Sequence, residues 1–89
     1  MAQESKLQTR IINDLKKRWN IPVKLIRTNT AGIADILVLT GNGSHFWIEV
    51  KAENGKESEL QKYIRNKLIL FWDTAHVVYN WDEYLSIYD

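Results

Sequence analysis

The stretch "GIADILVLTGNGSHFWIEVKAENG", residues 32–55, decides the fold. Two runs rich in branched and aromatic residues flank the turn sequence "GNGS", and this pattern predicts a β-hairpin. Asp35, Glu49 and Lys51 lie within the apolar runs. Charged groups in such a setting need partners or an ion, because burying a charge alone is costly. The stretch therefore predicts a hairpin and a polar site on it.

Glu49 and Lys51 are two residues apart on the second predicted strand, 45–52, so they project from the same face. Asp35 begins the first predicted strand, 35–40. It joins the other two in only one register of the hairpin, because a slip of one residue turns every side chain to the other face. The register therefore decides whether the three charged groups meet.

Two turns would give two different registers. A two-residue Asn42-Gly43 turn sets Asp35 opposite Val50, whereas a three-residue loop with Gly43 left-handed sets it opposite Glu49. Turn propensity alone favours the two-residue turn. We expect the three-residue loop, because it clusters charges that would each cost several kcal/mol if buried alone. A bulge elsewhere in either strand would produce the same clustering.

Hydrophobic periodicity predicts further elements on both sides of the hairpin. These are a helix over 4–19, a strand over 23–28 after Pro22, a helix from Ser58 to about Trp72, a strand over 75–80 and a short helix in 81–89. Leu60, Ile64, Leu68 and Phe71 are expected on the packed side of the second long helix. That helix could return the last strand parallel to the hairpin. We therefore expect one α/β domain, residues 1–89, with the order αβββαβ, a mixed central sheet flanked by helices, and a short C-terminal helix.

Composition limits the function classes. The chain has 89 residues, no cysteine and a net charge of +1, but residues 1–28 carry +5 and the remainder −4. A basic surface beside an acidic site suits a polyanion and a divalent cation, although a basic run is as often the solvated face of a helix. The start "MAQESKLQTR" resembles neither a signal peptide nor a membrane span, so an intracellular, cytoplasmic protein is expected.

The small size and the aromatic content favour a second subunit. So short a chain gains from burying apolar surface against a partner. The tryptophans are expected in the core or a subunit interface, with stacking on unpaired bases as the alternative: Trp19, Trp47, Trp72 and Trp81. Neither His45 nor His76 lies at metal-ligand spacing, so both are expected to be packed or surface residues.

Paired carboxylates on adjacent strands repel unless a cation lies between them. Oxygen ligands suit Mg²⁺ or Mn²⁺, and a neighbouring lysine can offset charge on a phosphate under attack. Phosphodiester hydrolysis therefore fits Asp35, Glu49 and Lys51 better than acyl or hydride transfer. The alternative for Glu49 and Lys51 is a cross-strand ion pair at the sheet margin, and Asp35 alone is typical of a turn before a strand.

The segments "GIADILVL", "FWIEVK" and "SELQ" resemble the VRR-NUC branch of the PD-(D/E)XK nuclease superfamily, whose members carry Gly-x-x-Asp, Glu-x-Lys and a downstream helical glutamine in this order. The similarity also includes "ESKLQ" and so covers about residues 4–70. Ala34 departs from it, because the family usually has proline before the aspartate. The resemblance implies a minimal restriction-endonuclease-like core.

The resemblance also implies roles for individual residues. Metal ligands would be Asp35, Glu49, the Val50 carbonyl and Glu4, the last directly or through water. Lys51 would be the catalytic lysine and Gln61 the helical glutamine. A border position reaching solvent is the alternative for Gln61, and a favourable place at the positive end of a helix is the alternative for Glu4.

Together these observations lead us to expect a structure-specific endodeoxyribonuclease that uses Mg²⁺ or Mn²⁺ and no organic cofactor. Standalone members of the VRR-NUC branch resemble Holliday-junction resolvases, so branched DNA and a two-fold homodimer are expected, and a phage or viral gene is compatible with this. Arg10 and Lys17 would contact phosphates without reading sequence. The alternatives are a non-catalytic nucleic-acid-binding or scaffold module with the nuclease fold, and an ordinary interaction domain.

Overall fold

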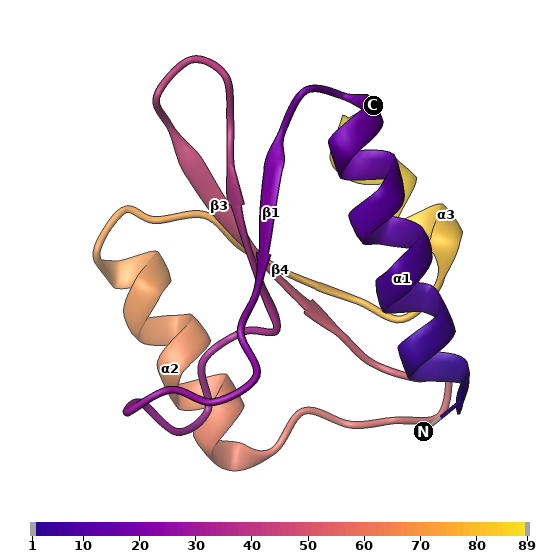
Figure 1. Ribbon diagram of the computed structural model, residues 1–89. Helices are drawn as coiled ribbons and strands as arrows, with labels where there is room; N and C mark the ends of the chain where they lie inside the picture. Colours follow the sequence, from indigo (N-terminus) through magenta and orange to yellow (C-terminus); the bar gives the residue numbers. More distant parts are fainter. Residues whose placement is uncertain (1, 89) are drawn as a thin grey trace.

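The computed structural model describes residues 2–88 (Figure 1). In chain order it contains α1 (Ala2–Lys17), β1 (Ile21–Lys24), β2 (Ile36–Leu39), β3 (His45–Val50), α2 (Glu59–Leu70), β4 (Ala75–Val78), α3 (Trp81–Leu85) and the 3-10 helix η1 (Ser86–Tyr88). The predicted αβββαβ order with a short C-terminal helix is confirmed. Within residues 2–88, none of the helices has the length and apolar character needed to cross a membrane.

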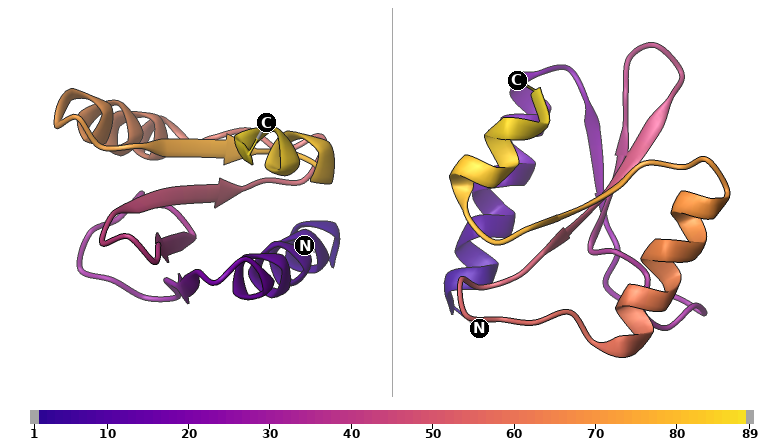
Figure 2. Two further views of the ribbon diagram at one scale, coloured as in Figure 1. Left: turned by 90° about the horizontal axis from the view of Figure 1, so that it is seen from above. Right: turned by 180° about the vertical axis from the view of Figure 1, so that it is seen from behind.

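The four strands form one mixed sheet in the order β1-β2-β3-β4. β2 runs antiparallel to both β1 and β3, whereas β4 lies parallel to β3. The parallel pair is possible because α2 connects the two strands on one side of the sheet. Figure 1 shows α2 on that side and α1 with α3 on the other, and the view from behind in Figure 2 shows the same separation.

The hairpin between β2 and β3 has the register expected from the charge argument. Ile36 lies opposite Ile48, and the Thr40 amide donates to the Ser44 carbonyl at 3.0 Å. Gly43 has a φ of 85°, the left-handed conformation that a three-residue loop requires. The prediction of the three-residue loop is therefore confirmed, and continuing the register places residue 35 opposite residue 49.

The core lies between the sheet and the pair α1 and α3. It consists of fully or almost fully buried side chains from five elements: Ile11, Leu15, Ile36, Val38, Ile48, Val50, Val78 and Tyr84. The Tyr84 hydroxyl donates to Asp14 at 2.7 Å, and Arg18 donates to the same carboxylate oxygen. This network joins α3 to α1 and satisfies the polar atom that the buried ring brings with it.

Both long helices end earlier than their hydrophobic patterns predicted. Trp19 and Trp72 lie just past α1 and α2, with φ of 64° and 65° and exposed fractions of 90% and 96%. The Asn20 and Asp73 amides then donate to the Leu15 and Leu68 carbonyls, five residues back. This is a Schellman ending, with tryptophan at the position that glycine usually occupies. Neither tryptophan therefore lies in the core of the domain, which was one of the two places expected for them.

The strand predicted over 23–28 is shorter and begins earlier, at Ile21. Pro22 lies inside it, which is tolerated because β1 is an edge strand. The packed side of α2 also differs from the prediction, since Leu60 is 46% and Phe71 65% exposed. The inward side instead carries Gln61, Ile64 and Leu68, which line a small cavity against the sheet.

Candidate active site

Asp35 lies where β2 and β3 separate. Ile36 and Ile48 are the last paired residues at this end of the hairpin. Beyond them, the Val50 amide donates to Oδ2 of Asp35 at 2.7 Å, so a side chain accepts the hydrogen bond that a strand carbonyl would otherwise accept. The Asp35 carbonyl still accepts from the Leu25 amide at 2.8 Å. The carboxylate is therefore held against the backbone of β3, with Oδ1 left for another partner.

Glu49 is the most unusual charged residue of the sheet. It lies between the core residues Ile48 and Val50, so strand alternation turns it to the opposite face, under α2. It is only 2% exposed, and its buried Oε2 has no hydrogen-bond partner among residues 2–88. Burial, followed by the negative charge of Glu57, raises its pKa to about 7, against the opposing effect of Lys51.

Asp35 has a raised pKa, and the causes identify its neighbours. Burial is the largest cause, and the hydrogen bond from the Val50 amide opposes it. The negative charge of Glu4 raises the pKa further, whereas Lys51 and Lys24 lower it. Glu4, at the start of α1, is therefore within electrostatic range of Asp35.

The backbone of β3 brings the Val50 carbonyl to the same edge as Asp35. The amides of Trp47 and Lys51 donate to β4, to the Thr74 and Val78 carbonyls, both at 2.9 Å. Because successive strand residues direct their amide and carbonyl groups to alternate sides, those of Val50 face β2. Lys51 follows directly after β3 and is half-buried. Asp35, Glu49, Lys51 and the Val50 carbonyl thus gather at one end of the β2–β3 pair.

Gln61 has a definite partner. The Ser58 amide donates to its Oε1 at 2.8 Å, and the Gln61 amide donates to Ser58 Oγ at 3.1 Å. This reciprocal capping box begins α2 and turns Gln61 inward, where it lines the cavity beside Glu49. Gln61 is partly exposed, so it lies at the border of the inward side of α2 while its Oε1 is held in the capping box.

The loop before β2 packs tightly on the start of α2. Gly32 has a φ of 83°, and a Cβ placed on it would lie 2.8 to 3.0 Å from side-chain and backbone atoms of Leu60. Only glycine fits both the conformation and the contact. Ala34, where the resemblance would have proline, is buried and lines the cavity beside Glu49.

Glu57 and Arg65 were not predicted from the sequence. One edge of the Arg65 guanidinium donates two hydrogen bonds to the Glu57 carboxylate, at 2.9 Å from Nε to Oε2 and 2.9 Å from Nη2 to Oε1. Arg65 lines the same cavity as Glu49. Glu57 precedes α2, so helical periodicity could not assign it a face. The spacing of the two residues, eight apart, is the only signal that the sequence contains.

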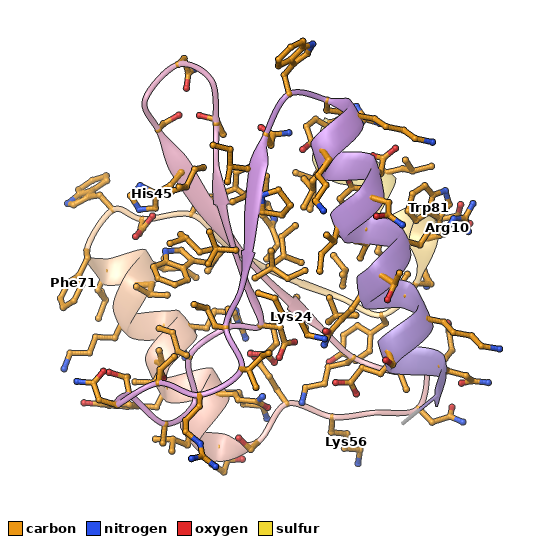
Figure 3. The ribbon with its side chains drawn as sticks, viewed as in Figure 1. Arg10, Lys24, His45, Lys56, Phe71 and Trp81 are labelled. Carbon is orange, nitrogen blue, oxygen red and sulfur yellow. The ribbon has the colours of Figure 1, made fainter. Side chains whose placement is uncertain are left out.

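Arg10 and Lys17 lie on the outer side of α1, away from α2. The Arg10 guanidinium stacks 3.8 Å from the centre of the Trp81 ring, and Figure 3 shows the two side chains together. Lys17 and Asn13 line the same shallow surface groove. Stacking fixes the plane of the guanidinium and leaves its edge free to bind an anion.

The donor set fits a divalent cation that is only partly held by protein. Among residues 2–88, no three side chains of histidine, cysteine, aspartate or glutamate converge closely enough to hold a metal by themselves. Mg²⁺ usually keeps several waters and binds through one or two carboxylates and a substrate phosphate. Asp35 and Glu49 supply two carboxylates, and the unpartnered Oε2 of Glu49 is an oxygen that needs a ligand.

No known family profile matches the chain, and no curated protein matches it. A solved structure described as "VRR_NUC domain" superimposes with a TM-score of 0.88 at 21% sequence identity. The likeness covers 97% of this chain and 94% of that one. The resemblance expected from the sequence is thereby confirmed at the level of architecture: the chain has the fold of a VRR-NUC domain.

Proposed function

We propose that the chain is a metal-dependent endonuclease that hydrolyses DNA phosphodiester bonds. One observation carries the proposal: Glu49 is a buried carboxyl beside Asp35 at the point where two strands separate, and one of its oxygens has no hydrogen-bond partner in the part of the chain that the structure describes. Burying such a group costs stability and contributes nothing to packing. A function that recruits a cation to this end of the sheet explains the cost.

Asp35, Glu49 and the Val50 carbonyl would hold Mg²⁺ or Mn²⁺, and Glu4, whose charge acts on Asp35, would contribute through a water. The bound ion would polarise a phosphoryl oxygen and lower the pKa of a water. Lys51 would offset the negative charge that grows on the phosphate during attack. Gln61 uses Oε1 in the capping box, so its amide nitrogen is the part of the side chain that could donate to a water or phosphate.

The α1 surface would position the DNA. Its start is within electrostatic range of Asp35 through Glu4, and Arg10 and Lys17 lie further along its exposed side. Contacts of this type bind phosphates without reading sequence and weaken as salt rises. Replacing both basic residues with glutamine should therefore weaken binding of every duplex to a similar extent.

A homodimer would bring two such sites onto paired strands of branched DNA. The outward side of α2 and the two residues after it carry six exposed apolar side chains: Leu60, Tyr63, Ile69, Leu70, Phe71 and Trp72. Figure 3 shows Phe71 pointing away from the body of the molecule. Each of the three aromatic side chains has a surface of about 150–250 Å², and the exposed fraction of that surface is available to an interface. With the aliphatic neighbours, the patch approaches the roughly 800 Å² per partner of a standard interface.

The dimer surface can be tested with matched variants. Trp72→Gly removes the ring and relieves a left-handed backbone, so it should yield a folded monomer. Trp19→Gly makes the same change at the end of α1, where the exposed ring lies outside the patch, and should leave the dimer intact. Light scattering after size exclusion measures both. A monomeric wild type, or equal behaviour of the two variants, would contradict this surface.

The catalytic proposal is tested with labelled four-way junction, flap and linear duplex in Mg²⁺, Mn²⁺ or chelator. We expect metal-dependent cleavage of a branched substrate, lost in Asp35→Asn and Lys51→Ala while folding is retained. Binding without cutting would favour a non-catalytic module with the nuclease fold. Within residues 2–88, no third acid converges with Asp35 and Glu49, and this observation favours the non-catalytic module.

A further inference from the structure

Glu57 and Arg65 form a bidentate ion pair next to the candidate metal site. Only 5% of the Glu57 side chain is exposed, against 30% of Arg65. Glu57 is fixed just before Ser58, the N-cap of α2, and Arg65 lies two turns further along the same helix. The pair therefore spans the first half of α2 on the side that faces the sheet.

The cavity under α2 is lined by one arginine, Arg65, and two carboxylates are close enough to compete for it. The Arg65 charge acts on both acids, and its two hydrogen bonds go to Glu57. Glu49, the candidate ligand, is left with a buried oxygen that has no hydrogen-bond partner within residues 2–88.

A guanidinium prefers bidentate binding to a carboxylate and loses most when it is buried without one. If Glu57 could not accept both hydrogen bonds, Glu49 would be the carboxylate that remains at the cavity. An ion pair between Arg65 and Glu49 would then occupy the oxygen that a cation needs.

We propose that Glu57 is a positioning residue that captures Arg65 and so keeps Glu49 open to a divalent cation. The inference rests on the proposed metal site and goes beyond it, because it assigns a role to two residues outside the ligand set. The proposed role also explains why a second acid, Glu57, is buried beside Glu49 and paired with Arg65. Neither residue needs to touch DNA or the cation to have this effect.

The test measures Mn²⁺ binding to the full chain by calorimetry, without DNA, in Glu57→Gln, Arg65→Met and the double variant. Glu57→Gln should weaken Mn²⁺ binding by about 10–100-fold, the usual effect of losing a residue that orients a ligand. Arg65→Met should bind at least as well as the wild type. In the double variant the competing arginine is gone, so affinity should return to within a few-fold of the wild type.

Each result either supports or contradicts the proposed role of Glu57. If the double variant binds as weakly as Glu57→Gln, Glu57 is itself a ligand or acts only through folding, and the capture proposal fails. Unchanged affinity in Glu57→Gln also overturns it. Glu59→Gln, which removes the exposed ion pair with Lys62 on the same helix, is the matched control and should have no effect. Thermal melts in chelator report folding, and the double variant shows whether binding recovers independently of stability.

Failure of this proposal is separable from failure of the proposed function. A wild type that binds no Mn²⁺ overturns both. The variants of Glu57 and Arg65 could change Mn²⁺ binding as described while the protein cuts none of the DNA substrates. That result supports the proposed role of Glu57 and rejects the endonuclease. Cleavage and Mn²⁺ binding that are both insensitive to Glu57→Gln reject the capture alone.

Discussion

Glu49→Gln should make the metal-free protein more stable at alkaline pH while removing its metal site. In the folded protein, burial and Glu57 raise the pKa of Glu49 from 4.5 to about 7. The protonated carboxyl is therefore the form that the fold favours. A glutamine resembles that form at every pH, because its amide is neutral and can donate a hydrogen bond to Glu57 as the protonated acid would.

The magnitude follows from the shift. Because the folded pKa is raised, the contribution of Glu49 to the free energy of unfolding is complete below about pH 4.5 and is lost as pH rises through about 7. At 1.36 kcal/mol per unit, the loss approaches about 3 kcal/mol at about pH 8.5. The variant should exceed the wild type by up to that amount there, and by only about 1 kcal/mol at about pH 5.

Urea denaturation in chelator, followed by tryptophan fluorescence at both pH values, measures the difference. Each kcal/mol should also raise the melting temperature by about 4–8 °C in a domain of this size. Added Mg²⁺ should stabilise the wild type and not the variant. A variant less stable than the wild type at alkaline pH, or a difference that does not change with pH, would refute the reasoning.

Three other substitutions test the packing around the site by urea denaturation. Gly32→Ala should cost at least about 1–3 kcal/mol, because alanine must adopt a φ of 83° and meet Leu60; an unchanged midpoint would mean that the loop moves freely. Ser58→Ala removes one half of the capping box and should cost about 1 kcal/mol, with Thr as the variant that restores it. Tyr84→Phe removes the hydrogen bond to Asp14 and should cost about 1–2 kcal/mol; a neutral result would show that the network contributes nothing.

The hairpin register could be predicted because the cost of burying isolated charges is larger than the local preference for one type of turn. Asn42-Gly43 favours a two-residue turn, but that turn would separate Asp35 from Glu49 in a packed setting. The register in the structure pairs Ile36 with Ile48 and agrees with the electrostatic argument. Turn propensity contributes less free energy than the burial of isolated charges costs. The pairing between the two strands therefore determined the register.

The ends of the helices could not be predicted in the same way. Trp19 and Trp72 continue the apolar periodicity of their helices, and nothing in the pattern marks them as capping positions. Their left-handed conformation is imposed by the chain reversals that follow, into β1 and β4. Tryptophan there is unfavourable compared with glycine, which is why a propensity argument extends the helix past its end.

The ion pair of Glu57 with Arg65 was also outside the reach of periodicity. Glu57 lies in the segment between β3 and α2, where the sequence has no repeating pattern, and its partner is chosen by tertiary packing. By contrast, Asp35, Glu49 and Lys51 were identifiable because charged residues stand out in apolar strands. The sequence identifies such residues because they are charged and their neighbours are apolar. The contacts that position them form only in the folded chain.

The most direct measurement is anomalous diffraction from crystals of the wild type grown with Mn²⁺. The account predicts a single strong peak at the end of the β2–β3 pair, in contact with Asp35, Glu49 and the Val50 carbonyl. Absence of a peak there at saturating Mn²⁺, or a peak bound by other residues, would contradict it.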